Sequence, residues 1–242
     1  MPEHRWLILD LRAPLMAFGG VTIDHVGVTR DFPALSMLTG LLANALGYRR
    51  TAWEQHQRLQ ERLIFAARRE REDPAGVLTD TQNAKLQAGE QGWTTWGQVE
   101  RRGGGSLDSP HRRQRDYHMD AHVCVALRLA DEAAGPDLEK LAAALDRPAR
   151  PLFIGRKPCL PSARLFAGFI EAPTAYRALQ RLPGEAGLES LRAQWPLGEG
   201  PQDGESVQRI FDLPDLRNWR TGLHGGSRKV VEGTLKPERL AA

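Results

Sequence analysis

Apolar positions recur along this chain at two periods, one typical of strands and the other of helices. Residues 6–12 are almost continuously apolar, which predicts a buried strand. Between residues 36 and 47, leucine and alanine recur three and four positions apart, which predicts an amphipathic helix. Ser36 is the predicted N-cap of this helix and Gly47 its C-terminal glycine.

The same two periods continue toward the C-terminus. They predict helices at 53–62, 137–146 and from Pro173 to about 182, and strands at 63–68, 120–129, 152–155, 166–170, 207–213 and 229–232. Residues 183–205 are rich in Gly, Pro and Glu and are expected to form a loop. The order strand, helix, strand, strand, helix, strand resembles a β-α-β-β-α-β ferredoxin-like core, a fold that hosts many functions.

The middle of the chain differs from both flanks. Residues 86–116 contain six glycines together with Trp93 and Trp96, and almost no aliphatic residues. A segment of this length without an apolar stripe is either disordered or a projecting functional arm. We therefore predict an α+β protein with a core over residues 1–182 that this arm interrupts. A β-rich C-terminal extension, residues 183–242, is expected to pack on the core as a loop and strands.

Composition excludes several classes of protein. The longest apolar stretch, residues 41–46, is too short to cross a bilayer, and no basic-then-apolar signal pattern follows the first residues. Cys124 and Cys159 form neither a disulfide framework nor a CxxC pair. His118 and His122 have a metal-like spacing, but on a strand this separates them by about 13 Å, too far for one ion. We expect a cytoplasmic protein without a membrane partner, metal or cofactor.

The basic residues are unusual in kind. Of 33 Lys and Arg only five are Lys, although the net charge is only +3. Arginine presents a planar fork that fits phosphate and stacks on bases, which favours a nucleic-acid partner. A GC-rich genome, in which Arg codons displace Lys codons, explains the same count equally well. The clustering of the arginines is therefore more informative than their number.

Two basic clusters stand out. The first lies between residues 101 and 118, at the end of the arm, and comprises Arg101, Arg102, His111, Arg112, Arg113, Arg115, Tyr117 and His118. Guanidinium groups interleaved with aromatic rings suit single-stranded nucleic acid, although a solvated loop has the same composition. The second is Arg156-Lys157, directly after a predicted strand. Cys159 follows it, but an inert thiol is favoured over a nucleophile there.

The first predicted helix has a second face made of small residues. These are Ser36, Gly40, Ala43, Asn44 and Gly47. Gly19, Gly20 and Arg30 precede the helix in sequence. Small residues let another backbone come close, and a helix N-terminus attracts anions, so one interpretation is a groove for a phosphate backbone. The other is tight packing against a neighbouring element.

Four stretches then occur in a recognisable order: Leu9-Asp10-Leu11-Arg12-Ala13-Pro14-Leu15-Met16-Ala17-Phe18-Gly19; Phe32-Pro33 running into the helix 36–47; Tyr117-His118-Met119-Asp120-Ala121 running into the next strand; and Leu152-Phe153-Ile154-Gly155-Arg156-Lys157-Pro158-Cys159. They resemble the CRISPR-associated Cas-five family, most closely its type I-E branch. Ala13 and Phe18 stand where that family usually has Gly and Trp. The match covers residues 6 to about 172.

The resemblance implies an RNA-recognition-like fold with a β-hairpin thumb, here residues 85–113. It implies a non-catalytic RNA-binding subunit of a type I-E surveillance complex (Cascade), which caps the 5′ handle of the CRISPR RNA in antiviral defence. Its partners would be the CRISPR RNA and the backbone and large subunits, with target DNA contacted only indirectly. The RNA-binding residues expected here are Gly19, Gly20, Arg30, Ser36, Gly40, Asn44, Arg101, Arg102, His111, Arg112, Arg113, Arg115, Tyr117, Arg156 and Lys157.

An alternative function is catalytic. One branch of the resembled family cuts precursor CRISPR RNA without a metal and is associated with a Tyr, Lys and His set. Here Tyr48, His111 and His118 would be the candidate acid and base groups, but no Lys lies between Lys85 and Lys140. A small enzyme unrelated to RNA is a third possibility, and it lacks motif support. We therefore expect no catalytic residues.

Overall fold

The computed structural model describes residues 2–20, 22–72, 76–85, 91–93, 97–101, 110–130, 135–184 and 190–238. The strands are β1 (His4–Arg12), β2 (Leu15–Met16), β3 (Thr22–Ile23), β4 (Val26–Gly27), β5 (Leu63–Arg71), β6 (Val77–Ala84), β7 (Gln91–Trp93), β8 (Val99–Arg101), β9 (His111–Met119), β10 (His122–Leu129), β11 (Phe166–Ala172), β12 (Leu191–Pro196), β13 (Val207–Leu213) and β14 (Arg228–Leu235). The helices are α1 (Leu35–Ala45), α2 (Trp53–Arg62), α3 (Leu138–Asp146) and α4 (Ala175–Gln180). None of these helices has the length and apolar composition needed to span a lipid bilayer.

An antiparallel sheet in the order β11-β1-β10-β5-β12-β14-β13 forms the centre of the molecule. Strand β1 is buried on both of its faces because side chains alternate along a strand. Leu7, Leu9 and Leu11 join one core cluster, whereas Trp6 and Ile8 join a second on the opposite face. This two-sided burial explains the nearly continuous apolar run in the sequence.

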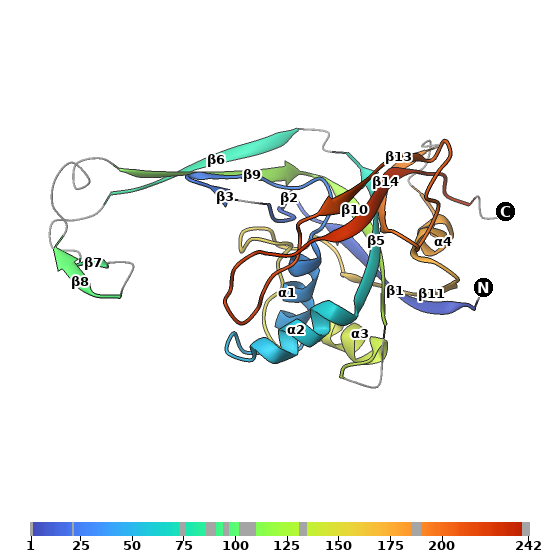
Figure 1. Cartoon of the computed structure of the whole chain (residues 1–242), viewed down its shortest axis with the longest axis horizontal. Coiled ribbons are helices and arrows are strands. Elements are labelled where there is room, and N and C mark those ends of the chain that lie inside the picture. Colours follow the sequence, from blue (N-terminus) through green and yellow to red (C-terminus); the bar gives the residue numbers. More distant parts are fainter. Residues whose placement is uncertain are drawn as a thin grey trace.

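The helices lie on both faces of the sheet (Figure 1). Helices α1, α2 and α3 contribute to the larger core cluster on one face, and α4 to the smaller cluster on the other. The elements β1, α1, β5, β10, α3 and β11 follow one another in the predicted order, and their strands are adjacent as β11-β1-β10-β5. The mixed α+β class with mostly antiparallel sheets is therefore confirmed.

The C-terminal strands extend the central sheet. Strand β12 pairs with β5, and β14 and β13 follow outward. The predicted loop at 183–205 is wrong in part, because residues 191–196 form β12. Ala193 and Trp195 are fully buried in this strand, but an apolar pattern of six residues beside a Gly- and Pro-rich segment is too short to be distinctive.

A long ribbon of β6 and β9 projects from the body (Figure 1), and the short strands β2, β4 and β3 belong to the same sheet. Strand β6 pairs with β9 from Val77 opposite His118 to Ala84 opposite His111. The sequence analysis did not predict strand β9, because its first six residues are all polar. Backbone pairing with β6, not burial of side chains, forms this strand. Much of the expected thumb, 85–113, lies outside the described residues, and the described ribbon already begins at Val77.

Two local predictions are wrong. The N-cap of α1 is Ala34, not Ser36, which lies inside the first helical turn. Residues 152–155 form bends instead of a strand, because Gly155 turns the chain with φ +92°. Helix α3 is capped by Asp137, whose side chain accepts from the Lys140 amide. Helix α2 and strands β5, β10, β11, β13 and β14 are confirmed within a few residues.

Candidate nucleic-acid interface

The second face of α1 opens onto a groove. Two adjoining cavities, of about 1000 and 290 Å³, share Gly40, Asn44, Phe153, Arg217 and Trp219 as lining residues. We call the two cavities together the α1 groove. Because α1 contributes the middle of this lining, its small residues leave an open surface here. The groove interpretation of the small face is therefore supported at Gly40 and Asn44.

The remainder of the small face packs against protein. Ala43 is fully buried in the core, and a side chain at Gly47 would come within 2.9 Å of Ala149. The two interpretations of this face thus each hold for part of it. Ser36 belongs to the open part, since it lines the smaller cavity.

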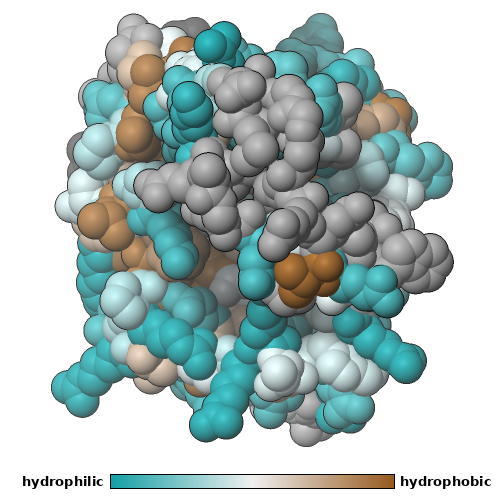
Figure 2. All heavy atoms as spheres, turned by 90° about the vertical axis from the view of Figure 1, so that its left-hand side faces the viewer, coloured by the Kyte–Doolittle hydropathy of each residue, from teal (hydrophilic) through white to brown (hydrophobic). Residues whose placement is uncertain are grey.

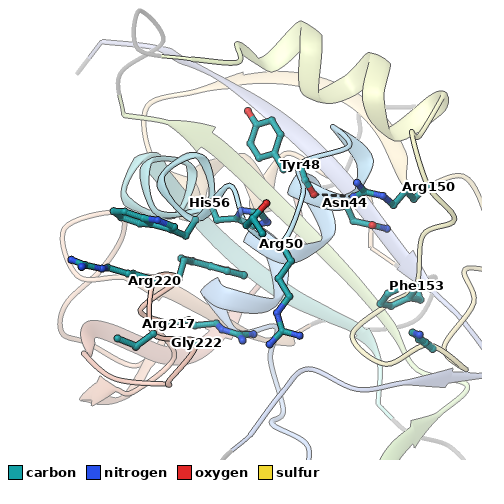
Figure 3. A pocket seen from close by; sticks show the side chains of 15 residues that line it. Asn44, Tyr48, Arg50, His56, Arg150, Phe153, Arg217, Arg220 and Gly222 are labelled. Atoms are coloured by element: carbon teal, nitrogen blue, oxygen red, sulfur yellow. Dashed lines mark hydrogen bonds between the residues drawn. The ribbon is translucent and has the colours of Figure 1, made fainter. Parts of the chain in front are cut away.

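The α1 groove is lined by cations without acidic neighbours. The basic residues are Arg50, Arg150, Lys157, Arg217 and Arg220 in the larger cavity and Arg156 in the smaller, and the described lining contains no Asp or Glu. Figure 3 shows Asn44, Arg150 and Phe153 on one side of the larger cavity, Arg217 and Arg220 on the other, and Arg50 extending between them. Such a concentration of one charge attracts a polyanion.

Most of these residues were missed by the sequence analysis. Arg50 follows α1, Arg150 precedes the Arg156 turn, and Arg217 and Arg220 lie in the loop between β13 and β14. They are separated along the chain by up to 170 residues, so no local cluster marks them. Only the packing of the C-terminal loop against α1 and α2 brings them together.

Aromatic rings support one wall of the groove. The Trp219 ring stacks on the His56 ring at 4.8 Å between centroids. The Tyr48 ring contacts the same His56 ring edge-on at 5.8 Å between centroids. The Arg217 guanidinium lies 5.0 Å from the Trp219 ring centroid. These contacts hold Trp219 in place from two directions, whereas Phe153 is half-buried and lines both cavities.

Helix α2 holds the C-terminal loop through one glutamine. Gln60 donates to the Arg217 carbonyl at 3.0 Å, while its side-chain oxygen accepts from the Arg217 amide at 3.2 Å and from Trp219 Nε1 at 3.1 Å. Gln60 is buried. A buried amide with donor and acceptor both bonded defines the position of what it holds.

Asp215 holds the start of the same loop against α1. Its carboxylate accepts from the Leu35 amide at 2.9 Å, and its backbone carbonyl accepts from the Ser36 amide at 3.1 Å. Arg228 donates to both carboxylate oxygens of Asp215, which is 1% exposed. Both amides of the α1 N-terminus, where we expected a phosphate, are therefore already bonded within the protein, the Leu35 amide to the Asp215 carboxylate and the Ser36 amide to its backbone carbonyl.

The opposite end of α1 is also bonded. Arg150 donates to the carbonyls of Tyr48 at 2.9 Å and Gly47 at 3.0 Å. A cation at a helix C-terminus is favoured by the helix dipole. Asn44 Nδ2 donates to the Pro151 carbonyl at 2.8 Å, which ties the same loop to the helix. The wall formed by residues 150–157 is thus fixed at two points.

The charge around the groove shifts the pKa of a nearby histidine. Burial, together with the positive charges of Arg217 and Arg30, lowers the pKa of His224, which lines the smaller cavity. Burial also raises the pKa of Tyr48. His224 is therefore neutral near pH 7, as expected where arginines are not balanced by carboxylates.

The predicted basic cluster of the arm lies elsewhere. His111, Arg112 and Arg113 are exposed on the ribbon strand β9. Arg113 and Arg115 donate to carbonyls of their own strand, those of Arg112 and Gln114. The side chain of Arg101 and all of Arg102 fall outside the described residues. Hydrophilic side chains predominate on the face of the molecule from which the ribbon projects (Figure 2).

Two expected RNA-binding residues make structural contacts within the protein. Tyr117 is 3% exposed, and the Arg156 guanidinium covers its ring at 4.9 Å. Arg156 also donates to the carbonyls of Asp116 at 2.7 Å and Gly27 at 3.0 Å. Tyr117 is thus unavailable for base stacking, and Arg156 ties the base of the ribbon to the body.

Gly19, Gly20 and Arg30 form the segment in front of α1. Gly19 has φ +84° and its carbonyl accepts from the Arg30 amide at 2.9 Å. Arg30 also donates to the Pro214 carbonyl at 2.8 Å, so it braces the C-terminal loop. Gly19 lines the smaller cavity, whereas a side chain at Gly20 would meet the Val28 carbonyl at 2.8 Å.

The three candidate acid-base residues do not come together, because His111 and His118 lie near opposite ends of β9 and Tyr48 follows α1. His111 is exposed near the far end of β9, and Tyr48 lines the larger cavity of the groove. His118 is 2% exposed, with its Nε2 atom 2.7 Å from the Arg30 carbonyl and its ring against Phe18. A buried, bonded imidazole cannot reach an RNA bound at the surface.

One group of described side chains has the donor types of a metal site. Asp10, His122 and Cys124 place one ligand atom each within 4.8 Å of one another. The Arg12 guanidinium donates to Asp10 at 2.9 Å, which places a positive charge beside the ligands. Burial, with added repulsion from Glu70, raises the pKa of Cys124 well above its usual range. The thiolate that a metal requires is therefore disfavoured.

Comparison with known proteins agrees with this fold. Residues 6–231 match the family described as CRISPR-associated protein (Cas_Cas5). The chain is 29% identical over 174 residues to the CRISPR system Cascade subunit CasD of Escherichia coli (strain K12), covering 72% of this chain and 75% of that relative.

Two solved structures share the fold. A chain of a CRISPR RNA-guided surveillance complex has a TM-score of 0.68 and 21% identity, with 96% of this chain and 90% of that chain covered. A chain from a structure titled "Crystal structure of Cas protein" has a TM-score of 0.60 and 24% identity, covering 99% and 97%. The resemblance drawn from the four sequence stretches is thus confirmed.

Proposed function

The chain belongs to the family of CRISPR-associated Cas5 proteins, and on that premise we propose that it is a non-catalytic, RNA-binding subunit of a CRISPR RNA-guided complex of the Cascade type. In that complex it caps the 5′ handle of the CRISPR RNA. The observation that carries the proposal is the α1 groove, whose described lining is cationic, partly aromatic and free of acidic residues.

Such a groove suits a single RNA strand. Guanidinium groups meet phosphates, and rings meet unstacked bases, which a duplex does not present. The core order β1-α1-β5-β10-α3-β11 fits a ferredoxin-like, RNA-recognition-like fold. Of the residues expected from the sequence, Gly19, Ser36, Gly40, Asn44, Arg156 and Lys157 line the groove. Arg50, Arg150, Arg217 and Arg220 join them in the proposed interface.

The ribbon β6/β9 is the proposed thumb. Its exposed side chains His111, Arg112 and Arg113 extend away from the body, where they contact RNA and the neighbouring backbone subunit. The large subunit is a further partner, and target DNA is met only through the assembled complex.

A metal-independent endoribonuclease is the second candidate function. It is less well supported because His111 and His118 lie near opposite ends of β9, Tyr48 lies in the α1 groove, and His118 is buried. General acid-base cleavage requires the base within hydrogen-bond reach of the 2′-hydroxyl. The arrangement of these three residues does not place an acid and a base together at one RNA 2′-hydroxyl.

Incubating the purified chain with a labelled repeat RNA in chelator tests both functions. Binding is measured by filter retention and cleavage on a denaturing gel. We expect the RNA to be bound and to remain intact. Cleavage at a single position would instead support the nuclease, and absence of binding at low salt would remove the proposed function.

A further inference from the structure

The smaller cavity of the α1 groove has the properties of a pocket for one planar group. Its volume of about 290 Å³ lies at the lower end of the range for small-ligand pockets, roughly 300–1,000 Å³. The apolar part of its lining is Ala17, Met37, Leu41, Phe153 and Trp219. It adjoins the larger cationic cavity through a shared boundary, so a strand lying in the larger cavity passes its entrance.

Polar groups without partners face this pocket. Ser36 is 9% exposed and lines the cavity, yet its hydroxyl has no hydrogen-bond partner among the described residues. The Ser36 oxygen is accessible to solvent in the cavity, so its hydroxyl can donate to or accept from a group that enters there. Its position two helical turns from Asn44 puts the two polar groups at opposite ends of the same exposed strip of α1.

Asn44 supplies the second polar group, and its orientation is defined. Its Nδ2 atom donates to the Pro151 carbonyl at 2.8 Å, so the amide oxygen is the atom that can accept a hydrogen bond from a ligand. No hydrogen bond to that oxygen exists among the described residues. The smaller cavity therefore offers an acceptor at Asn44 and a donor-acceptor at Ser36, and Arg217 also lines it.

Glycines and apolar groups shape the pocket between these polar ends. Gly40 lies between Ser36 and Asn44 on α1, and a side chain there would come to 3.7 Å from the Trp219 ring. Phe153 and Trp219 are the shared walls of both cavities. An aromatic wall combined with hydrogen-bonding groups at the rim is the arrangement by which proteins bind an unstacked base.

We propose that the smaller cavity binds one unpaired nucleobase, turned out of the RNA strand that occupies the larger cavity, with Ser36 and Asn44 bonding its edge. This rests on the proposed RNA-binding function and deepens it. The pocket makes one position of the bound RNA sensitive to its base, whereas the surrounding arginines bind phosphates at every position alike.

The experiment uses a set of labelled single-stranded repeat RNAs, each with one abasic nucleotide at a different position. Loss of a base that stacks and bonds in a pocket lowers affinity roughly 10- to 100-fold. With the unmodified chain we expect one position to show a loss of this size. Neighbouring positions are expected to change less than about threefold.

Three variants assign that position to the cavity. Ser36→Leu fills the pocket with an apolar side chain, and Ser36→Ala removes only the unpartnered hydroxyl. In Ser36→Leu the abasic RNA and the unmodified RNA should bind with nearly equal affinity, because the pocket no longer accepts the base. Asn44→Leu should reduce the penalty in the same direction. Ser162→Ala, an exposed serine outside both cavities, is the matched control and should keep the full penalty.

Thermal unfolding of each variant checks that it is folded, and Ser36→Ala keeps the test decisive if Ser36→Leu is not. Position-specific loss that disappears in the Ser36 variants supports the pocket. If the chain binds RNA but every abasic RNA binds alike, or if the Ser36 variants keep the full penalty, the pocket proposal is overturned while the RNA-binding function stands. If the unmodified chain binds none of the RNAs, the proposed function itself fails.

Discussion

The α1 groove and the β6/β9 ribbon both carry exposed arginines, but the surroundings of those arginines differ. In the groove, the Arg150 side chain is bonded to two carbonyls at the end of α1, and the Arg217 guanidinium lies 5.0 Å from the Trp219 ring centroid. On the ribbon, the Arg113 side chain bonds the carbonyl of its own neighbour Arg112 and no other group among the described residues.

This difference separates two ways of binding the same polyanion. An arginine that is already fixed loses little further rotamer freedom on binding, of the up to roughly 2 kcal/mol that a mobile one has to lose. The groove is therefore suited to hold a strand in one register. The ribbon supplies charge that adapts to whatever backbone it meets, which favours affinity over discrimination.

The largest expected effect on stability comes from a substitution at Gly155, which lines the smaller cavity of the groove. A side chain there would lie 1.7 Å from the Ala17 carbonyl oxygen, and its φ is +92°. We expect Gly155→Ala to lower the free energy of unfolding by more than about 4 kcal/mol in urea titrations. Gly198→Ala is the control, because Gly198 has φ +91° with nothing within 4 Å. It should cost only about 1–2 kcal/mol, and equal losses in both variants would contradict the steric argument.

Asp215 tests whether the loop wall of the groove depends on its buried ion pair. Replacing it with Ala leaves Arg228 and the Leu35 amide without their partner, so we expect a loss of about 3 kcal/mol in stability. RNA affinity should fall further than the fraction unfolded explains, because Arg217 and Trp219 follow Asp215 in the loop. Asp212→Ala is matched, since its pair with Lys229 spans 3.6 Å and is exposed. A loss below about 1 kcal/mol is expected there.

A smaller and different effect is expected on the ribbon. Arg112→Glu with Arg113→Glu should leave stability unchanged and weaken RNA binding. The slope of log affinity against log salt should also become shallower by about 1.4 for two lost contacts to a single strand. Arg177→Glu on α4, across the sheet from α1, is the control and should change neither. If the double variant keeps the same slope of log affinity against log salt as the unmodified chain, the ribbon is not part of the RNA interface.

His224 gives the smallest expected effect and concerns pH. Its pKa is lowered by burial and by Arg217 and Arg30, so its folded-state pKa lies below the unfolded value of 6.5. Its contribution to stability is complete above pH 6.5 and is lost as the pH falls toward the folded pKa. Phosphates bound beside these arginines offset their charge and raise the pKa of His224.

RNA binding should therefore take up a proton below pH 6.5, and affinity should rise as pH falls, by less than about tenfold. The measurement is a binding titration between pH 5 and 8 for the unmodified chain and for His224→Gln. The difference between the two profiles isolates His224 from the other histidines. Identical profiles would place the bound phosphates away from this end of the groove.

The sequence by itself determined the elements whose apolar periods are long enough to be distinctive. Strand β1, helix α2 and strand β10 follow from such periods, because burial on one or two faces leaves a direct trace in residue order. The small face of α1 was also evident from spacing alone. Its open part, Gly40 and Asn44, lies in the groove.

Tertiary structure decided the rest, because the relevant neighbours are distant in the chain. Tyr117 and Arg156 looked like RNA ligands in sequence, but packing buries the ring and uses the guanidinium to bond backbone carbonyls. Asp215 and Arg217 carried no signal, since a lone Asp or Arg in a loop is usually solvated. They act on α1 from about 180 residues away, as the bond between Asp215 and Leu35 illustrates. Local spacing records which side chains are buried, whereas only the fold brings together the loops that form the groove.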